Sequence, residues 1–317
     1  MHTVSLAVRE FMASDEVRRR APNTRKKQAF VLRLLLSERC ELKPTDPIAR
    51  LSRSHVDAAL NVARDRNSAE SSLNTYRSDL RRFGKWLLNC GYVKRDPAAH
   101  LENVRTSTPR AKRRPISRPQ ASQLIAAAER VHPRDGMTAM LMLTTGLRES
   151  EVIRLTWADL DIATSSGTAY RPKGRDEHPL HLSPQLCAAL EKWQALYEER
   201  HGPIAATWYV VPALRHRSDG RTPRHMHADW QMSPTSPQHS VGTRVKAWLA
   251  AVGETDLKGR ASHTMRRTAA NILYERTGDI RTVQTFLGHK SVAMTELYLD
   301  IDAAQVKLRK SMESFEI

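Results

Sequence analysis

The chain has 317 residues, 40% of them hydrophobic, which suits about two domains with cores of their own. Lys and Arg outnumber Asp and Glu by 51 to 34, and this net charge of +17 favours a polyanionic partner. No apolar run is long enough to span a membrane, no signal peptide is recognisable, and three scattered cysteines form no CxxC pair, which argues against a disulfide framework and a cysteine-based zinc site. We therefore expect a reduced, cytoplasmic protein that does not contact a membrane.

The positive charge is concentrated in the first part of the chain. Residues 1–107 hold 21 basic and 12 acidic residues, and the segment 108–115 adds four basic residues without an acid. This distribution favours a nucleic-acid partner, although membranes and ribosomes also attract basic surfaces and a plain solvated surface has a similar composition. Proline and like charge discourage a packed element at 108–118, so we expect a basic linker there between domains at 1–107 and 119–317.

Residues 1–103 carry a helical repeat of apolar side chains and no strand signal. The pattern predicts a bundle of four or five helices, among them Pro22–Cys40, a helix capped by Ser54, and Ser72–Cys90, which is the strongest and has Gly91 at its C-cap. Basic residues recur every four positions along that last helix. They fit a nucleic-acid contact and an ordinary solvated face equally well: Arg77, Arg81 and Lys85.

Residues 119–317 are predicted to be mostly helical with one small antiparallel sheet. Met137–Thr145 is almost wholly apolar, which predicts a helix buried on all sides that breaks at Gly146. Alternation on both sides of a Lys-Gly-Arg turn predicts a hairpin of Ala169–Arg171 and Pro179–Leu182. The stretch 203–239 is rich in Pro, His and Arg and yields no clear element. Further helices, the last two capped by Asp279 and Ser291, are expected at 149–155, 184–200, 240–252, 263–277, 279–287 and 291–298.

Breaking a DNA phosphodiester bond places three demands on an enzyme. A nucleophile must attack phosphorus, cations must face the non-bridging oxygens, and a proton must reach the departing oxygen. Arginine suits the second demand because its planar fork meets two oxygens at once. The sequence has no carboxylate cluster of the metal-binding kind, and His225-Met226-His227 with Asp229 is a weak candidate for a metal pair. We therefore expect an arginine–histidine site with no metal and no cofactor.

Separate motifs supply such groups in order along the chain. The first is TTGLRESEV at 144–152, the second is HTMRRTA at 263–269, and the third is LGHKS at 287–291, followed by MTELY at 294–298. In this order, and with His289 nine residues before Tyr298, they resemble the tyrosine site-specific recombinases, the phage integrase family. Lys173, the only lysine between Lys112 and Lys192, completes the set. The resemblance covers the whole catalytic half.

The resemblance implies a role for each motif residue. Arg148 and Arg266 match the two family arginines and are expected to bind the scissile phosphate. Glu151, one helical turn beyond Arg148, is expected to orient it by a salt bridge. His263 is expected to contact the phosphate or help to take the tyrosine proton, and His289 to contact a non-bridging oxygen.

The two remaining residues complete the implied reaction. Lys173 is the expected general acid for the departing 5′-oxygen, and Tyr298 is the expected nucleophile, which forms a 3′-phosphotyrosyl link. A tyrosine phenol is protonated at neutral pH and is then a poor nucleophile, so nearby cations are needed to favour its deprotonation. Because the covalent ester stores the bond, rejoining needs neither ATP nor a metal.

The first half resembles the family less specifically. NTYRSDLRRF at 74–83, followed by Asp96-Pro97, is similar to the family's helical, SAM-like domain that clamps DNA. The implied fold class is mainly α, with this bundle joined to an α+β catalytic domain. Double-stranded DNA is the implied partner, with a homo-tetramer on DNA that exchanges strands through a Holliday junction, while the free chain is compatible with a monomer. The tail after Tyr298 is expected to dock on a neighbouring protomer or on its own domain through Val306, Leu308, Met312 and Phe315.

Two features depart from the family pattern, and two other functions stay open. Arg267 stands where the family often has histidine, and Pro172 restrains the hairpin beside Lys173. The first alternative function is a type IB-like topoisomerase, which relaxes DNA without synapsis. The second is a DNA-binding regulator that keeps an inactive catalytic fold. The motifs do not encode the target site, or whether the reaction integrates, excises, inverts or resolves DNA.

Overall fold

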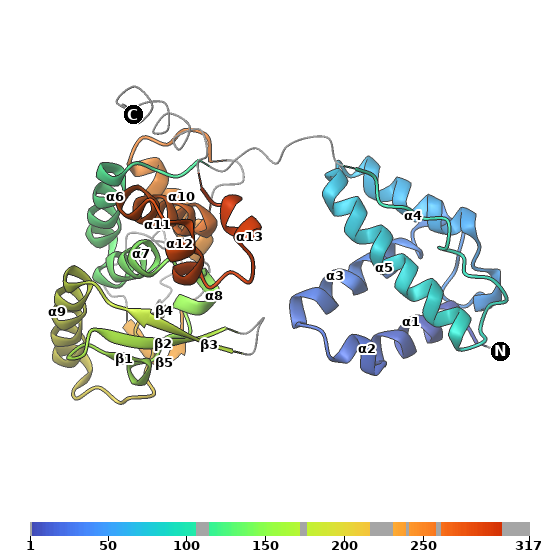
Figure 1. The fold of residues 1–317 in the computed structure, drawn as a ribbon. Coiled ribbons are helices and arrows are strands. Elements are labelled where there is room, and N and C mark those ends of the chain that lie inside the picture. The colour runs from blue at the N-terminus through green and yellow to red at the C-terminus, as the bar shows by residue number, and fades with distance from the viewer. Residues whose placement is uncertain are drawn as a thin grey trace, which may run out of the picture. The chain divides into compact units, whose positions relative to one another are not determined.

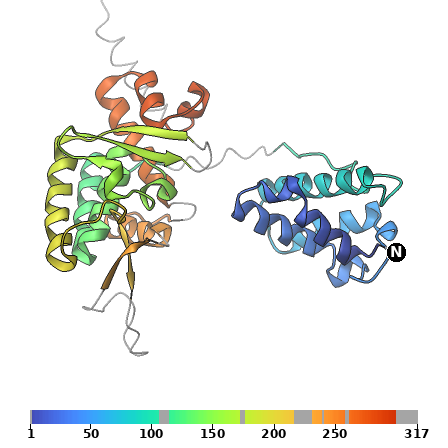
Figure 2. The same ribbon diagram turned by 90° about the horizontal axis from the view of Figure 1, so that it is seen from below.

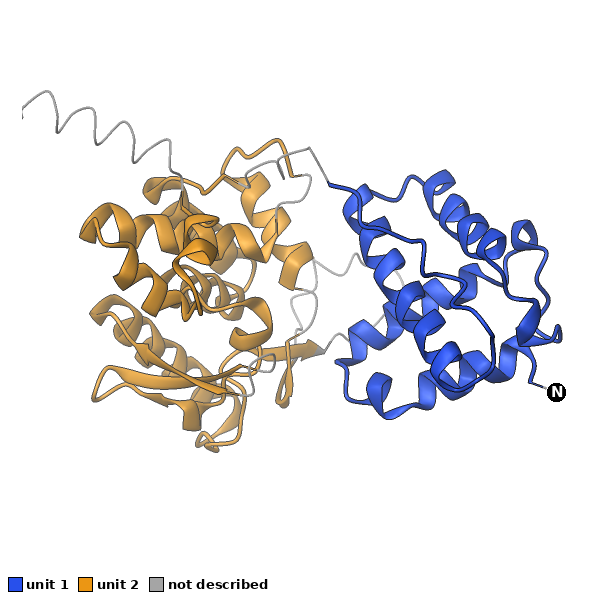
Figure 3. Ribbon diagram, turned by 45° about the vertical axis from the view of Figure 1, so that its right-hand side comes forward, with its two compact units in different colours: residues 1–111 blue, residues 112–317 orange. Residues whose placement is uncertain are grey.

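The computed structural model describes residues 2–105, 114–171, 176–215, 231–238, 241–257 and 261–299. The chain divides into two compact units, residues 1–111 and residues 112–317 (Figure 3). In the described residues, no helix is long and apolar enough to cross a membrane.

The described residues of the first unit form a helical bundle (Figure 1). Its core is one continuous cluster of buried apolar side chains, to which the longest helix contributes a stripe that repeats at helical spacing: Leu73, Leu80, Phe83 and Leu87. Short 3-10 turns at Glu38–Cys40 and Ile48–Arg50 connect the helices. The α-helices are α1 (Val4–Ala13), α2 (Asp15–Arg18), α3 (Pro22–Leu34), α4 (Arg53–Asp65) and α5 (Glu70–Asn89).

Two predicted boundaries in this unit are wrong, one by six residues and one by two. The helix predicted over Pro22–Cys40 ends at Leu34 and is followed by a 3-10 turn. The helix predicted to be capped by Ser54 begins at Arg53, because Ser52 is the N-cap and its N–H donates to His55 Nδ1 (3.1 Å). The strongest predicted helix is confirmed as α5, and Gly91 follows it with φ +70°.

The basic face predicted on α5 is not a plain solvated face. Arg77 is only 4% exposed, and its Nη1 donates to Glu70 Oε1 and Asn74 Oδ1, both at 2.6 Å. Arg81 donates from Nη1 to the carbonyl of Leu101 (3.1 Å). Arg77 is therefore closed to an outside ligand and Arg81 ties α5 to the segment after it, while Lys85 stays exposed.

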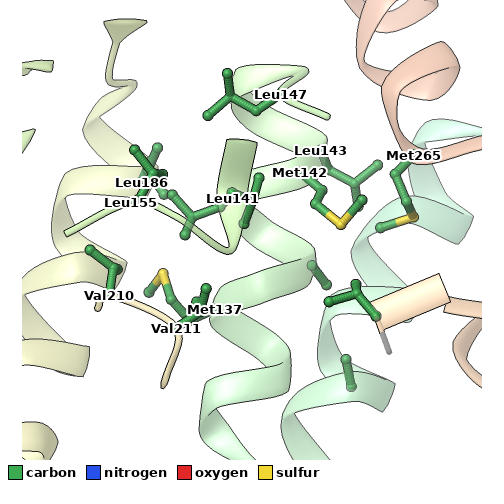
Figure 4. Close-up of a cluster of buried hydrophobic side chains, with 14 of the residues drawn as sticks. Met137, Leu141, Met142, Leu143, Leu147, Leu155, Leu186, Val210, Val211 and Met265 are labelled. Atoms are coloured by element: carbon green, nitrogen blue, oxygen red, sulfur yellow. The ribbon is translucent and has the colours of Figure 1, made fainter. Parts of the chain in front are cut away.

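In the second unit, α7 is the central helix. It packs against helices on several sides, and its side chains meet Leu186 on one flank and Met265 on another (Figure 4). This burial confirms the prediction that the apolar run Met137–Thr145 lies inside the unit. The α-helices are α6 (Arg118–Val131), α7 (Pro133–Thr145), α8 (Glu149–Val152), α9 (Pro184–His201), α10 (Val241–Ala251), α11 (Ser262–Thr277), α12 (Ile280–Leu287) and α13 (Val292–Glu296).

Several helix limits in this unit differ from the prediction by one to three residues. The helix expected at 149–155 ends at Val152, and the last one ends at Glu296. Asp279 caps α12 as predicted, since its carboxylate accepts from the N–H groups of Arg281 (2.8 Å) and Thr282 (2.9 Å). Ser291 occupies the N-cap position of α13 without a side-chain hydrogen bond.

The described residues of the second unit form two small antiparallel sheets, where one was predicted (Figure 2). The expected hairpin forms β2 (Ser166–Arg171) and β3 (Asp176–His181), with Arg171 opposite Asp176, and the short β1 (Leu160–Asp161) joins β2 after a 3-10 turn at Trp157–Asp159. The second sheet pairs β4 (Pro212–Arg215) with β5 (Gln231–Pro237), inside the stretch 203–239 that yielded no prediction. These strands were missed because they are rich in proline and serine and lack alternating apolar residues.

Candidate active site

A sharp turn after α7 starts the site. Gly146 ends α7 with φ +63°, and a Cβ there would come 2.6 Å from the ring of Phe286 on α12. The turn therefore needs glycine both for its left-handed backbone and for the close approach of α12. Arg148 follows two residues later as the N-cap of α8. Its side chain therefore lies next to the C-terminal end of the buried helix α7.

Arg148 and Glu151 form the first ion pair of the site. Arg148 donates to Glu151 from its main-chain N (2.8 Å to Oε2) and from Nη1 (2.7 Å to Oε1). Burial alone would raise the pKa of Glu151, but the hydrogen bonds from Arg148 and the charges of Arg148 and Arg266 bring that pKa below its usual value. Glu151 is therefore a buried carboxylate that orients Arg148, while the Arg148 side chain keeps 27% exposure to a ligand.

Arg266 lies at the centre of the site and is 1% exposed. Its Nη1 donates to the carbonyl of Gly146 (2.5 Å), and its Nη2 donates to the carbonyl of Leu287 (2.6 Å). Burial, and next the charge of Arg148, lower its pKa to about 10, so it stays a cation at neutral pH. Arg266 thus links α11 to the ends of α7 and α12.

His289 is buried next to Arg266. Its Nε2 lies 3.2 Å from Arg266 Nη2, and its Nδ1 lies 3.1 Å from Thr295 Oγ1. Burial, and next the charge of Arg266, lower the pKa of His289 to about 4, so the ring is neutral at pH 7. Because a guanidinium can only donate, Nε2 accepts and the ring proton is assigned to Nδ1, facing Thr295.

Tyr298 follows α13 and faces the same group of side chains. Its hydroxyl lies 3.4 Å from His263 Nδ1, and its ring centroid lies 4.9 Å from that of His289. The guanidinium carbons of Arg266 and Arg267 lie 5.8 Å and 5.5 Å from the centre of the phenol ring. Two cations and two imidazoles of one chain therefore surround the phenol.

A cleft of about 290 Å³ opens beside these residues. Arg148, His263 and Arg266 line it together with Glu149, Ser150, Ile153 and Ser262. The cleft presents guanidinium and imidazole groups with a tyrosine next to them. Such a surface suits an anionic tetrahedral group such as a phosphodiester.

Five of the six predicted catalytic residues come together here, from three separate parts of the chain: Arg148, His263, Arg266, His289 and Tyr298. The sixth, Lys173, lies outside the described residues, as do His225, Met226, His227 and Asp229. In the part of the chain that the structure describes, no group of three His, Cys, Asp or Glu side chains could hold a metal ion.

Arg171 is a buried arginine that the sequence analysis missed. It donates from Nη1 to the carbonyl of Gly288 (3.0 Å) and from Nη2 to that of Leu287 (3.1 Å). His178 Nε2 lies 3.1 Å from the carbonyl of Phe286. The hairpin thus binds the last carbonyls of α12, which lack partners within the helix and carry partial negative charge. Alternation in β2 could have revealed Arg171, since it shares the inner face with the buried Ala169.

Comparisons with known proteins agree with this arrangement. A sequence model of the phage integrase family matches residues 115–305. The tyrosine recombinase XerC of Xanthomonas campestris pv. campestris is 27% identical over 266 residues, which cover 81% of this chain and 72% of that protein. XerC of a Mycobacterium species is 27% identical over 314 residues and 97% of both chains.

Solved structures share the fold. A lambda integrase dimer bound to a COC′ core site has a TM-score of 0.64 at 18% identity, over 92% of this chain and 97% of that one. The Tn1549 transposon integrase in complex with transposon right end DNA has a TM-score of 0.67 at 15% identity, over 98% of this chain and 100% of that one. These matches confirm the predicted fold class, a helical unit followed by a catalytic unit with small antiparallel sheets.

Fold and sequence together define a tyrosine recombinase, a site-specific enzyme that acts on DNA. The chain belongs to the phage integrase family, because the family's model matches more than half of its length.

Proposed function

We propose that the chain cuts and rejoins double-stranded DNA with Tyr298 as its nucleophile. The observation that carries the proposal is the position of the Tyr298 hydroxyl, 3.4 Å from His263 Nδ1 and beside the cleft that Arg148 and Arg266 line. The hydroxyl oxygen attacks phosphorus, the bond to the 5′-oxygen breaks, and a 3′-phosphotyrosyl ester forms. The 5′-hydroxyl of a second strand then reverses the step and releases the tyrosine.

The surrounding residues divide the remaining tasks. Arg148 and Arg266 neutralise the non-bridging oxygens, and Glu151 holds Arg148 in place. His263, in its Nε2-protonated tautomer, accepts the phenol proton. His289 is neutral and contacts a non-bridging oxygen through an N–H, for which its proton moves from Nδ1 to Nε2 when phosphate replaces the Arg266 contact.

Lys173 is the proposed general acid for the 5′-oxygen, on the strength of its place in the turn of the hairpin motif. Replacing it by alanine is expected to slow the cleavage of ordinary DNA. A substrate with sulfur in place of the 5′-bridging oxygen is expected to be cleaved normally by Lys173→Ala, because a thiolate leaves without a proton. Equal loss on both substrates would exclude this role.

The basic composition and the DNA complexes of the lambda and Tn1549 integrases support DNA as the partner. We propose that residues 1–107 are a DNA-clamping domain, that 119–317 are the catalytic domain, and that the basic segment 108–118 is the tether between them. Double-stranded DNA is the proposed ligand. Four protomers are proposed to act on paired sites and to exchange strands through a Holliday junction.

A nicked suicide substrate tests the proposal. The substrate loses its short 5′-hydroxyl fragment after cleavage, so the covalent complex accumulates and survives SDS. The native chain is expected to form this complex and Tyr298→Phe to form none, while Tyr209→Phe removes another phenol hydroxyl of the same unit and serves as the control. A catalytically inactive regulator would give no complex with the native chain. A topoisomerase would relax supercoiled DNA that lacks a target site.

A further inference from the structure

One face of α11 carries two pairs of functional side chains. His263 and Arg266 line the cleft, and Arg267 and Asn271 lie four and eight residues after His263 along the same helix. Residues at these spacings share one side of an α-helix. The second pair reaches the main chain around Tyr298 instead of the cleft.

The contacts of this second pair are with carbonyl groups next to the nucleophile. Arg267 donates from Nη2 to the carbonyl of Leu297, and Asn271 donates from Nδ2 to the carbonyl of Tyr298 (2.9 Å). Asn271 Nδ2 also donates to the carbonyl of Arg267 (2.8 Å) on its own helix. Carbonyls at the end of a short helix such as α13 have no N–H donor within the helix. The side chains of Arg267 and Asn271 supply these missing donors.

Other contacts hold the two ends of the segment 295–299. At its N-terminal end, Thr295 Oγ1 lies 3.1 Å from His289 Nδ1. At its C-terminal end, Leu299 is buried in one apolar cluster with Ala270 and Val283. The Leu297 side chain is 68% exposed and adds little packing of its own. The bonds from Arg267 and Asn271 therefore tie the main chain around Tyr298 to the helix that carries His263.

We propose that Arg267 and Asn271 are positioning residues for the nucleophile. They fix the main chain of Tyr298 on α11, so that the phenol and His263 are held by one rigid helix. Arg267 also adds a positive charge 5.5 Å from the centre of the ring, which favours the phenolate. This inference rests on the proposed role of Tyr298, and it gives a function to the arginine that stands where histidine is common.

The first measurement is the rate of covalent complex formation with saturating suicide substrate. Arg267→Met and Asn271→Leu keep side-chain volume and remove the donors, and each is expected to slow cleavage by roughly tenfold to hundredfold because the hydroxyl is displaced. Arg267→Lys keeps the charge and one donor and should recover part of the rate. Arg276→Met removes an exposed cation from the same helix and should cleave like the native chain.

The second measurement separates positioning of the tyrosine from damage to the site. An oligonucleotide with a 3′-p-nitrophenyl phosphate can be joined without Tyr298: a 5′-hydroxyl attacks phosphorus, the bond to the nitrophenyl oxygen breaks, and coloured p-nitrophenolate leaves. In the Tyr298→Phe background, Arg267→Met and Asn271→Leu are expected to join at rates within about twofold of Tyr298→Phe alone.

Three results are informative. Slow cleavage with normal joining supports the inference. Equal loss of cleavage and joining means that the two residues only maintain α11, and unchanged cleavage means that they do not position the tyrosine; either result overturns it. The native chain distinguishes these failures from a failure of the proposed function, because absence of a Tyr298-dependent covalent complex would refute the nucleophile itself.

Discussion

At the scale of single residues, Gly288 is constrained twice. Its φ of +57° is unfavourable for any residue with a side chain, and a Cβ would lie only 1.9 Å from Arg171 Nη1. We expect Gly288→Ala to lower the free energy of unfolding by about 3 kcal/mol, since it adds backbone strain and forces Arg171 from buried carbonyls. Chemical denaturation measures this loss.

Gly278 provides the matched control. It also follows a helix with a positive φ, +66°, but a Cβ there would meet no atom within 4 Å. Gly278→Ala should therefore cost only the backbone strain, about 1 kcal/mol. Equal losses for the two variants would show that Arg171 does not hold the end of α12.

His289 is expected to make stability depend on pH. Burial, and next the charges of Arg266, Arg148 and Arg171, lower its folded pKa to about 4 from 6.5, so below pH 6.5 the unfolded chain binds a proton that the folded chain does not. Stability should then fall by about 2 kcal/mol from pH 7 to pH 5 on account of this residue. His132, with a pKa lowered to about 4 chiefly by burial, adds an effect of the same sign.

A comparison of His289→Gln with the native chain isolates the His289 contribution. In thermal unfolding between pH 5 and pH 7, the stability of the variant should depend less steeply on pH than that of the native chain. The pH dependence that stays in the variant comes from His132 and other groups. A variant with the native pH dependence would contradict a buried neutral imidazole at this position.

The grouping of residues at the site could be predicted where a motif marked them, and not where packing alone placed them. Arg148, His263 and Arg266 stand in recognisable motifs, and the structure brings them together. Arg171 carries the same charge, but it binds the carbonyl of Leu287, 116 residues further along the chain, and a single sequence does not reveal such a partner. Alternation in β2 could indicate that Arg171 faces inward, but its partners become known only from the fold.

At the scale of elements, strong apolar periodicity predicted helices well. A long apolar repeat marks α5, and a long apolar run marks α7. Both patterns are typical of a helix, and both helices were located to within a few residues. The sheet of β4 and β5 escaped because its pairing, such as Leu214 with Met232, joins distant residues that carry no alternating pattern. Elements defined by local sequence were predictable, and elements defined by long-range pairing were not.

A cluster of buried charged side chains joins α7, α10 and β4. Asp135 on α7 is fully buried and accepts from Arg134 and from Arg244 on α10 (2.6 Å), while Arg134 Nη1 donates to the carbonyl of Pro212 at the start of β4 (3.0 Å). Asp135→Asn is expected to lower the free energy of unfolding by about 3–5 kcal/mol, because the charge of Arg134 loses its buried partner.

Arg244→Met tests the same cluster from its more exposed side. Arg244 keeps 27% exposure, so its loss should cost clearly less than Asp135→Asn in urea unfolding. If both variants unfold like the native chain, the cluster does not tie α7 to β4 and α10.

At the scale of the whole molecule, the net charge of +17 predicts how the chain responds to salt. A protein that contacts DNA through many phosphates releases counterions, so its affinity falls by roughly a thousandfold or more between 50 and 200 mM salt. Fluorescence anisotropy with a labelled duplex measures the slope. A flat response would rule out broad enclosure of DNA by the basic surfaces of the chain.

The central claim is that one tyrosine carries the broken strand. Trapping the complex on a suicide substrate, digesting it with protease and nuclease, and sequencing the nucleotide-bearing peptide by mass spectrometry identifies the linked residue. We predict a 3′-phosphate ester on the Tyr298 phenol in a peptide that contains MTELY. A nucleotide attached to any other residue, or a complex that Tyr298→Phe still forms, would contradict the account.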